Sequence, residues 1–190
     1  RRPAAYITGE AIYAGLKFFV DERVLVPRSP IAEIILRDFQ PWLGGREVHS
    51  ILDLCTGCGA IAIACAVAFP DAQVVGTDLS EGALEVARHN AELNQVDLRV
   101  DMIKSNLFDA LEGQTFDLIV TNPPYVGGEE IAELAAEYKH EPEMAFAGGG
   151  DGLDMVAELI MAAPDYLNPD GLLILEVGYS AYFMELRWPD

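Results

Sequence analysis

Short apolar runs alternate with amphipathic stretches along most of the chain. The apolar runs are rich in Val, Ile and Leu and are bounded by turn residues, which is typical of buried strands. They predict strands at residues 50–54, 73–78, 98–104, 116–120 and 171–177. Apolar residues at helical spacing predict helices at 60–68, 129–138 and 153–163, and one that Ser80 caps and that contains Leu84, Ala87 and Ala91. Strands that alternate with crossover helices indicate an α/β fold with a mostly parallel, doubly wound sheet.

The segment before this alternation has a different pattern. Two β-prone runs within residues 12–26, on either side of residues 20–23, predict a β-hairpin. Ser29 then suits the N-cap of a helix, and Pro30 suits its first position. Residues 41–49 contain Pro and Gly and are typical of a linker. We therefore expect an N-terminal region of hairpin, helix and linker at 1–48 and a second domain at 49–190.

The composition limits the kinds of partner that the protein can bind. A chain of 190 residues, 51% of them hydrophobic, can bury a sizeable core. Its formal net charge of −19 disfavours direct binding of DNA or RNA, whose capture relies on clustered Lys and Arg. The same charge would favour a basic protein partner, and it serves equally well to keep a protein soluble.

The cysteines and the apolar runs bear on location. Cys55, Cys58 and Cys65 are odd in number and closely spaced, so they do not resemble a disulfide framework and fit a reducing compartment. No apolar run reaches the roughly 18 residues of a membrane span, and no signal-peptide pattern is present. We therefore expect a cytoplasmic protein without a membrane contact. Cys55 and Cys58 have metal-site spacing, but no second cysteine pair accompanies them, so we expect no metal.

A glycine-containing turn at residues 53–59 joins the first strand of the second domain to its helix. Gly57 and Gly59 permit a left-handed backbone and let N–H groups approach a ligand, toward which the following helix directs its positive end. Asp78 ends the next strand, where a carboxylate can accept both hydrogen bonds of a ribose diol. The turn could also simply reverse the chain, and the acid could be solvated. The spacing predicts an adenosine site and leaves S-adenosylmethionine and a dinucleotide as alternatives.

The sequence Thr-Asn-Pro-Pro-Tyr at residues 121–125 follows the fourth predicted strand of that domain. Two successive prolines donate no N–H group, so this backbone is rigid and presents carbonyls beside the Asn122 amide oxygen. A pair of acceptors would hold an –NH2 group, and the Tyr125 ring could cover a flat substrate. An isolated Asn-Pro-Pro can be only a turn. At the end of a strand in an adenosine-binding sheet, it resembles the motif of methyltransferases that modify planar amino or amide nitrogens.

Further motifs recur in the order of one known family. They are Tyr6–Glu10, Tyr13–Leu16, Arg23–Arg28, the Asp53 turn, Asn122–Tyr125, Glu141–Pro142 and Gly149–Leu153. Together they resemble the HemK-type protein-glutamine methyltransferases over essentially the whole chain. Residues 27–33 and 140–143 are similar to the branch that modifies large-subunit ribosomal protein three. The resemblance implies a Rossmann-like class I fold and methyl transfer from S-adenosylmethionine to a glutamine side-chain nitrogen of that basic protein.

The resemblance also implies roles for individual residues. The Asn122 side-chain oxygen and the Pro123 carbonyl would accept the two glutamine N–H bonds, with Tyr125 packed on the amide plane. The residues that contact the cofactor would be Asp53, Cys55, Thr56, Gly57, Gly59, Asp78, Leu79, Asn106, Leu107 and Asn122. Those that contact the substrate would be Val26, Arg28, Asn122, Pro123, Pro124, Tyr125 and Glu141. Asn106 stands where the family usually has Asp near the adenine amino group, and its oxygen can still accept that hydrogen bond.

Other interpretations stay open at this point. A release-factor glutamine methyltransferase and an adenine-amino nucleic-acid methyltransferase would use the same pair of acceptors. A nicotinamide oxidoreductase would fit Gly57, Gly59 and Asp78, and a cofactor-binding scaffold is a further alternative. Because family members begin with a helical domain and end with a strand hairpin, we expect residues 1–48 to be a remnant of the connection to that domain and the last strands of the sheet to be missing.

Overall fold

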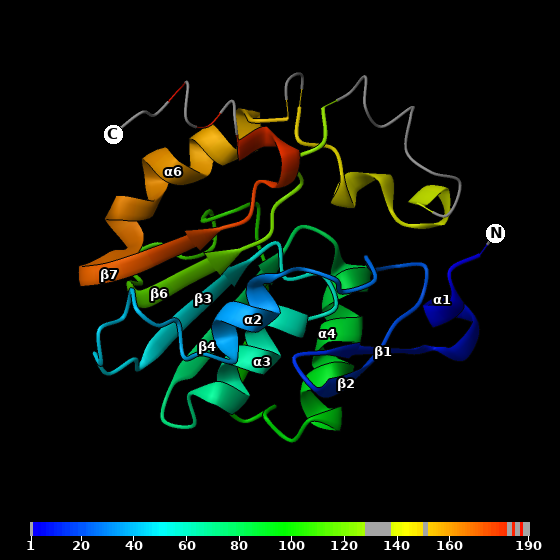
Figure 1. The fold of residues 1–190 in the computed structure, drawn as a ribbon, viewed down its shortest axis with the longest axis horizontal. Helices are drawn as coiled ribbons and strands as arrows, with labels where there is room; N and C mark the ends of the chain where they lie inside the picture. Colours follow the sequence, from blue (N-terminus) through cyan, green and yellow to red (C-terminus); the bar gives the residue numbers. More distant parts are fainter. Residues whose placement is uncertain (1, 128–137, 150–151, 182–183, 185–186, 188–190) are drawn as a thin grey trace.

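The computed structural model describes residues 2–127, 138–149, 152–181, 184 and 187 (Figure 1). Its centre is a five-stranded sheet in the order β5-β4-β3-β6-β7, in which each neighbouring pair is parallel. The strands are β3 (Ser50–Leu54), β4 (Gln73–Asp78), β5 (Val100–Lys104), β6 (Phe116–Thr121) and β7 (Leu167–Leu175). All five predicted strands are therefore confirmed, and the parallel sheet is confirmed with them.

Helices cover both faces of the sheet (Figure 1). They are α2 (Ile31–Ile35), α3 (Ala60–Ala68) and α4 (Glu81–Leu93) on one face and α6 (Asp154–Tyr166) on the other. Successive side chains of a strand point to opposite faces, so Ile51 joins the apolar cluster of α3 and α4 while Leu52 joins that of α6. The doubly wound α/β class is thereby confirmed.

The N-terminal hairpin is present, but its turn lies earlier than predicted. Helix α1 (Ala4–Thr8) precedes strands β1 (Glu10–Tyr13) and β2 (Leu16–Phe19), which pair antiparallel. Ala14 and Gly15 form the turn with φ values of 48° and 78°, as a tight two-residue hairpin requires. The prediction of a hairpin around residues 20–23 was wrong, because Asp21 instead accepts a hydrogen bond from the Val24 N–H (3.1 Å) in a separate turn.

Helix boundaries show where local signals suffice. The Ser80 hydroxyl accepts from the Ala83 N–H (3.3 Å), which confirms it as the cap of α4. Ser29 accepts from the Ile31 N–H (3.2 Å), but α2 begins at Ile31 with Pro30 as its N-cap, one residue later than predicted. Helix α6 continues past Pro164, since a proline in the last turn removes only one donor. The predicted helix at 129–138 lies almost entirely outside the described residues.

The remaining differences concern short elements. Strand β7 begins before residue 171 because a bulge shifts its register between the pairs Phe116–Leu167 and Leu118–Leu172. The described residues also contain three 3-10 helices, namely η1 (Tyr138–His140), η2 (Glu143–Ala145) and η3 (Gly178–Ser180). Within the part of the chain that the structure describes, every helix is too short or too polar to cross a membrane.

A buried amide joins the hairpin to the rest of the fold. Asn90 of α4 is fully buried, and its side-chain oxygen accepts from the Phe19 N–H (2.7 Å). Its amide nitrogen donates to the carbonyls of Phe19 (3.0 Å) and Cys58 (2.9 Å). One side chain thus links β2 to the glycine turn after β3. The chain that follows β2 then runs toward the carboxyl ends of the strands of the central sheet.

Candidate active site

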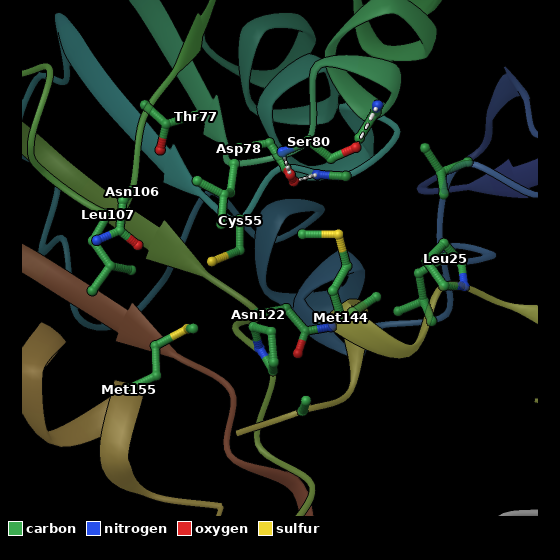
Figure 2. A pocket seen from close by; sticks show the side chains of 18 of the residues that line it. Leu25, Cys55, Thr77, Asp78, Ser80, Asn106, Leu107, Asn122, Met144 and Met155 are labelled. Carbon is green, nitrogen blue, oxygen red and sulfur yellow. Dashed lines mark hydrogen bonds between the residues drawn. The ribbon is translucent and has the colours of Figure 1, made fainter. Parts of the chain in front are cut away.

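A cavity of about 280 Å³ lies at the carboxyl ends of β3, β4, β5 and β6 (Figure 2). Figure 2 shows Asp78 across the cavity from Asn122. Asn106 and Leu107 lie on one side, and Leu25 lies on the other. The predicted site residues that line it are Cys55, Gly57, Asp78, Leu79, Asn106, Leu107, Asn122 and Pro124. Parallel strands bring their carboxyl ends to one edge of the sheet, so residues far apart in the sequence meet there.

Asp53, Thr56 and Gly59 were predicted to contact the cofactor, but they do not line the cavity. They instead lie behind the residues of the glycine turn that do line it. Asp53 is fully buried, and its Oδ2 accepts hydrogen bonds from the Thr56 hydroxyl and from the Ala62 N–H (3.0 Å). Its other oxygen, Oδ1, has no hydrogen-bond partner among the described residues. Burial raises the pKa of Asp53 to about 7. Asp53 therefore ties the turn to the first turn of α3, while Gly59 forms the N-cap of that helix.

The two glycines of the turn meet different surroundings. Gly59 has φ +81°, and a Cβ there would lie 3.0–3.1 Å from Ile63, Ala87 and Met102. Gly57 has φ +55°, lines the cavity, and a Cβ there would meet nothing within 4 Å. Gly59 is thus required by packing inside the fold, whereas Gly57 exposes its backbone to the cavity.

Asp78 ends β4 and holds the turn at the cavity. Its Oδ2 accepts from the Gly57 N–H (2.9 Å), and its Oδ1 accepts from the Ser80 N–H (2.8 Å). Burial raises the pKa of this carboxyl, and the backbone hydrogen bonds partly oppose the shift. Each carboxylate oxygen can accept a second hydrogen bond. Asp78 therefore orients the turn and still has acceptor sites for hydroxyl groups in the cavity.

Asn122 directly follows β6 and lines the same cavity. Its Oδ1 is buried and has no hydrogen-bond partner among the described residues. A buried amide oxygen without a partner costs roughly 1–3 kcal/mol, so native structures rarely leave one without a purpose. This oxygen therefore lacks the donor that would satisfy it, and the residue that carries it lines the cavity.

Tyr125 and Pro123 do not line the cavity. Pro123 is buried, and the Tyr125 hydroxyl donates to Glu176 Oε1 (3.1 Å), just beyond the end of β7. Burial, together with the nearby Glu176 carboxylate, raises the pKa of Tyr125 to about 12. The Ser29 hydroxyl donates to the other oxygen of Glu176. Sequence reasoning missed Glu176, although an acid at the carboxyl end of a predicted strand is the same signal that identified Asp78.

The predicted substrate residues Val26, Arg28 and Glu141 form one cluster. The Glu141 side chain is only 1% exposed and accepts from the Val26 N–H (3.0 Å) and from Arg28 Nη2 (2.9 and 3.0 Å). The Arg28 guanidinium also lies 4.8 Å from the centre of the Tyr138 ring. Glu141 thus fixes the segment after the hairpin against the segment that precedes η2.

Glycines on a second segment allow close approach to the proline corner, which is residues 122–125. A Cβ at Gly148 would lie 2.9 Å from the Pro124 carbonyl oxygen, and one at Gly152 would collide with that of Tyr125. Val126 exchanges backbone hydrogen bonds with this segment, donating to the Phe146 carbonyl (2.8 Å) and accepting from the Gly148 N–H (2.9 Å). The glycine motif at 149–153 therefore coincides with a place where backbone packs directly on backbone.

Apolar side chains that the sequence did not single out complete the cavity. They include Val24, Leu25, Met144, Ala145 and Met155. Met144 belongs to η2 and Met155 to α6, so the two methionines come from separate segments. Single apolar residues of this kind carry no local pattern that would mark them as part of a cavity lining. Their presence makes one part of the cavity suitable for an apolar or flat ligand group.

The three cysteines are free thiols. Cys55 lines the cavity, and burial raises the pKa of Cys55 and of Cys58 to about 12, which keeps both in the unreactive thiol form. Across the described ranges, no group of three or more His, Cys, Asp or Glu side chains is arranged to hold a metal ion.

Curated relatives resemble the chain over nearly its whole length. The ribosomal protein uL3 glutamine methyltransferase of Francisella tularensis is 48% identical, over 100% of this chain and 61% of the relative. The protein of the same name from Xanthomonas campestris is 54% identical, over 95% of this chain and 58% of the relative. The chain therefore spans about three fifths of the length of the relatives it matches, and its expected relationship to protein-glutamine methyltransferases is confirmed.

Solved structures and a family match agree with this relationship. A methyltransferase from Pyrococcus furiosus has a TM-score of 0.62 and 25% identity, over 90% of this chain and 74% of its own. A ribosomal protein L11 methylase from Lactobacillus delbrueckii shares the fold, with a TM-score of 0.51 and 24% identity over 76% of this chain and 57% of its own. Residues 32–151 match the methyltransferase small domain. Since this match covers more than half of its length, the chain belongs to the methyltransferase small domain family.

Proposed function

We propose that this chain transfers a methyl group from S-adenosylmethionine to the side-chain amide nitrogen of a glutamine in ribosomal protein uL3. The observation that carries the proposal is the buried, unpartnered Asn122 Oδ1 beside a cavity that the expected cofactor residues line. The names of the curated relatives support this reaction and this substrate. The product of the cofactor would be S-adenosylhomocysteine.

The residues around the cavity fit this cofactor. When bound, S-adenosylmethionine supplies a methyl group on a positively charged sulfur. After the transfer, this sulfur belongs to a neutral thioether, which is the leaving group. Gly57 offers open backbone, and the Asp78 oxygens can accept hydrogen bonds from ribose hydroxyls. Asn106 and Leu107 would border the adenine, and Leu79 and Cys55 would close the remaining wall. Asp53, Thr56 and Gly59 would act from behind by shaping the turn.

The proline corner would orient the acceptor. An amide nitrogen is a poor nucleophile because its lone pair is delocalised into the carbonyl group. Asn122 Oδ1 and the Pro123 carbonyl would accept the two N–H bonds of the glutamine, turn its lone pair toward the methyl group and stabilise the positive charge that develops. Alignment of this kind lowers barriers by about 7–11 kcal/mol in the best intramolecular cases. No strong base is needed, since the methylated nitrogen becomes acidic and releases its proton to an acceptor or to water.

The substrate would reach this corner past a surface shaped by both the hairpin segment and η2. Tyr125 would pack on the amide plane, with Pro124 at the cavity wall. Arg28, Val26 and Glu141 hold one another in place and would border the substrate backbone. The net charge of −19 suits a basic ribosomal protein and disfavours a nucleic acid. A ribosomal substrate also agrees with a cytoplasmic location, and we propose that residues 1–48 connect the catalytic domain to a further substrate-binding part.

Two substitutions test whether Asn122 acts chiefly on methyl transfer and Asp78 chiefly on cofactor binding. Asn122→Ala should lower methyl transfer to uL3 by about 10²–10³-fold, because a preorganised polar group at a reacting centre is worth about that much. The affinity for S-adenosylmethionine should stay within a few-fold. Asp78→Ala should chiefly weaken that affinity. Isothermal titration calorimetry measures the affinity, and transfer of a radiolabelled methyl group to purified uL3 measures the rate.

The same assay separates the alternative substrates. We expect labelled uL3, with the glutamine located by mass spectrometry, and no label on a release factor or on nucleic acid. A thermal-shift comparison separates the cofactors, because a ligand at 100 times its Kd stabilises the fold by about 2.7 kcal/mol. Stabilisation by a nicotinamide dinucleotide instead, or a normal rate in Asn122→Ala, would refute the proposed function.

A further inference from the structure

Glu176 stands at the meeting point of three segments that are distant in sequence. It directly follows β7, and its N–H donates to the Thr121 carbonyl at the end of β6 (3.0 Å). Figure 1 shows the ends of these two strands side by side. Its carboxylate accepts from the Tyr125 hydroxyl (3.1 Å) and from the Ser29 hydroxyl. One side chain therefore connects the proline corner to the segment that leads into α2.

The two hydroxyl groups are the partners that stabilise this charge. Among the described residues, Glu176 forms no ion pair within 4 Å, and the nearby Arg28 is paired with Glu141. A partly buried carboxylate needs donors, and hydrogen bonds to a charged acceptor are stronger than those between neutral groups. Ser29 is itself fixed, because its oxygen accepts from the Ile31 N–H (3.2 Å). Glu176 thus connects the Tyr125 hydroxyl to Ser29, whose position is fixed by its own hydrogen bond.

The Tyr125 ring is constrained at both ends. Its hydroxyl is held by Glu176, while its backbone carbonyl accepts from the Ser180 hydroxyl (3.4 Å). Gly178 lies against the ring, and a Cβ at that position would lie 2.5 Å from Tyr125 Cε2. The hydroxyl oxygen lies on the axis of the second rotatable bond, so the contact with Glu176 fixes the direction of the ring, and the packing of Gly178 against one ring edge restricts its plane. Tyr125 directly follows the two prolines of the corner that would present the glutamine amide.

We propose that Glu176 is a positioning residue, whose carboxylate holds the Tyr125 and Ser29 hydroxyls and thereby fixes the direction of the Tyr125 ring, so that the ring, with its plane restricted by Gly178, packs on the glutamine amide. This inference rests on the proposed function, since it assigns Glu176 a purpose in orienting that substrate. Glu176 does not line the cavity that would hold the cofactor. Its effect on the reaction passes through Tyr125.

A spectroscopic experiment tests the contact without any methyl transfer. Fluorotyrosine incorporation brings phenol ionisation to a pH at which the fold survives, and loss of one fluorine signal in Tyr125→Phe assigns Tyr125. Glu176→Gln should let Tyr125 ionise about one pH unit lower, because the neighbouring negative charge no longer opposes it. Arg28 and Tyr138, the other ionisable groups that affect the pKa of Tyr125 among the described residues, are unchanged in this variant. An unchanged titration would overturn the proposal.

Kinetics then test the purpose of the contact. Glu176→Gln and Tyr125→Phe should each lower kcat about 10- to 100-fold with the Kd for S-adenosylmethionine unchanged, because small displacements of an orienting group cost rates of this size. The double variant should be no slower than either single one, since both changes break the same contact. Glu176→Asp should recover part of kcat. The control Glu10→Gln removes an exposed carboxylate that pairs with Lys17 and should change neither readout.

The outcomes separate this inference from the proposed function. Additive losses in the double variant, or a normal kcat in Glu176→Gln, would overturn the positioning role. A chain of unaltered sequence that methylates no candidate substrate would overturn the proposed function, and the titration would still support the link between Glu176 and Tyr125.

Discussion

The glycine turn (residues 53–59) and the proline corner (residues 122–125) lie at the carboxyl ends of adjacent strands, and each contains one buried side-chain oxygen that has no hydrogen-bond partner among the described residues. In the turn it is Asp53 Oδ1, which belongs to a fully buried residue away from the cavity. In the corner it is Asn122 Oδ1, which belongs to a residue that lines the cavity. A proton can neutralise the first group, whereas only an N–H or O–H donor can satisfy the second. We therefore expect the first oxygen to affect the titration of the fold, and we propose that the second one binds a ligand.

The two regions are also held in different ways. In the turn, Asp53 binds Thr56 and Ala62 within nine positions of itself, and Asp78 and Asn90 add contacts from β4 and α4. The corner depends on distant residues, since Glu176 and Gly152 contact Tyr125 from elsewhere in the chain. This contrast predicts that the corner is the easier of the two to disturb from outside.

The largest expected effect is a pH dependence of stability that originates in the turn. Burial raises the pKa of Asp53 to about 7, whereas the unfolded chain has the ordinary value of about 3.9. The folded chain thus holds a proton that the unfolded chain releases, and stability falls as pH rises through this interval. The loss amounts to up to about 4 kcal/mol and ends above about pH 7. Urea unfolding across a pH series measures it.

Asp53→Asn provides the matched comparison for this titration. An amide keeps the acceptor for Thr56 and Ala62 but cannot ionise, so most of the fall with pH should disappear and the variant should be the more stable chain at alkaline pH. A smaller fall of the same sign should persist because the pKa of Asp78 is also raised. Asn122→Ala should keep the full pH dependence. Parallel curves for Asp53→Asn and the unaltered chain would contradict the assignment.

The second largest expected effect is a loss of stability caused by a substitution at Gly152, which packs against the proline corner. Gly152 has φ +81°, and a Cβ there would collide with the Tyr125 carbonyl oxygen and lie 3.1 Å from the Gly127 nitrogen. Gly152→Ala should destabilise the fold by about 3 kcal/mol, which combines left-handed strain with overpacking. Gly113 has a similar φ of +78° in open space, so Gly113→Ala should cost only about 1 kcal/mol. Thermal unfolding compares them, and equal losses would show that Gly152 is not packed against the corner.

This contrast also explains what the sequence could predict. The strands, the Ser80 cap and the glycine turn depend on neighbouring residues, and their patterns placed them correctly. The hairpin turn was misplaced because the charged residues at 21–23 give a stronger local signal than Ala14, whose positive φ is seen only in the paired strands. Met144 joined the cavity lining through tertiary packing that no local spacing encodes, whereas Glu176 ends a predicted strand and its contact with Tyr125 is what the sequence could not predict. The roles assigned to the site residues remain predictions that the variants test.

The smallest effect separates the two glycines within the turn. Gly59→Ala should destabilise the fold by about 2 kcal/mol, because its Cβ would press on Ile63, Ala87 and Met102 at a positive φ. Gly57→Ala should cost only about 1 kcal/mol, since its Cβ meets nothing within 4 Å. That Cβ would enter the cavity, however, so Gly57→Ala should weaken S-adenosylmethionine binding more than Gly59→Ala does. Unfolding and calorimetric titration of both variants give the two rankings. If Gly59→Ala instead shows both the larger loss of stability and the larger loss of affinity, the backbone at Gly57 is not a binding surface separate from the packed core beneath the turn.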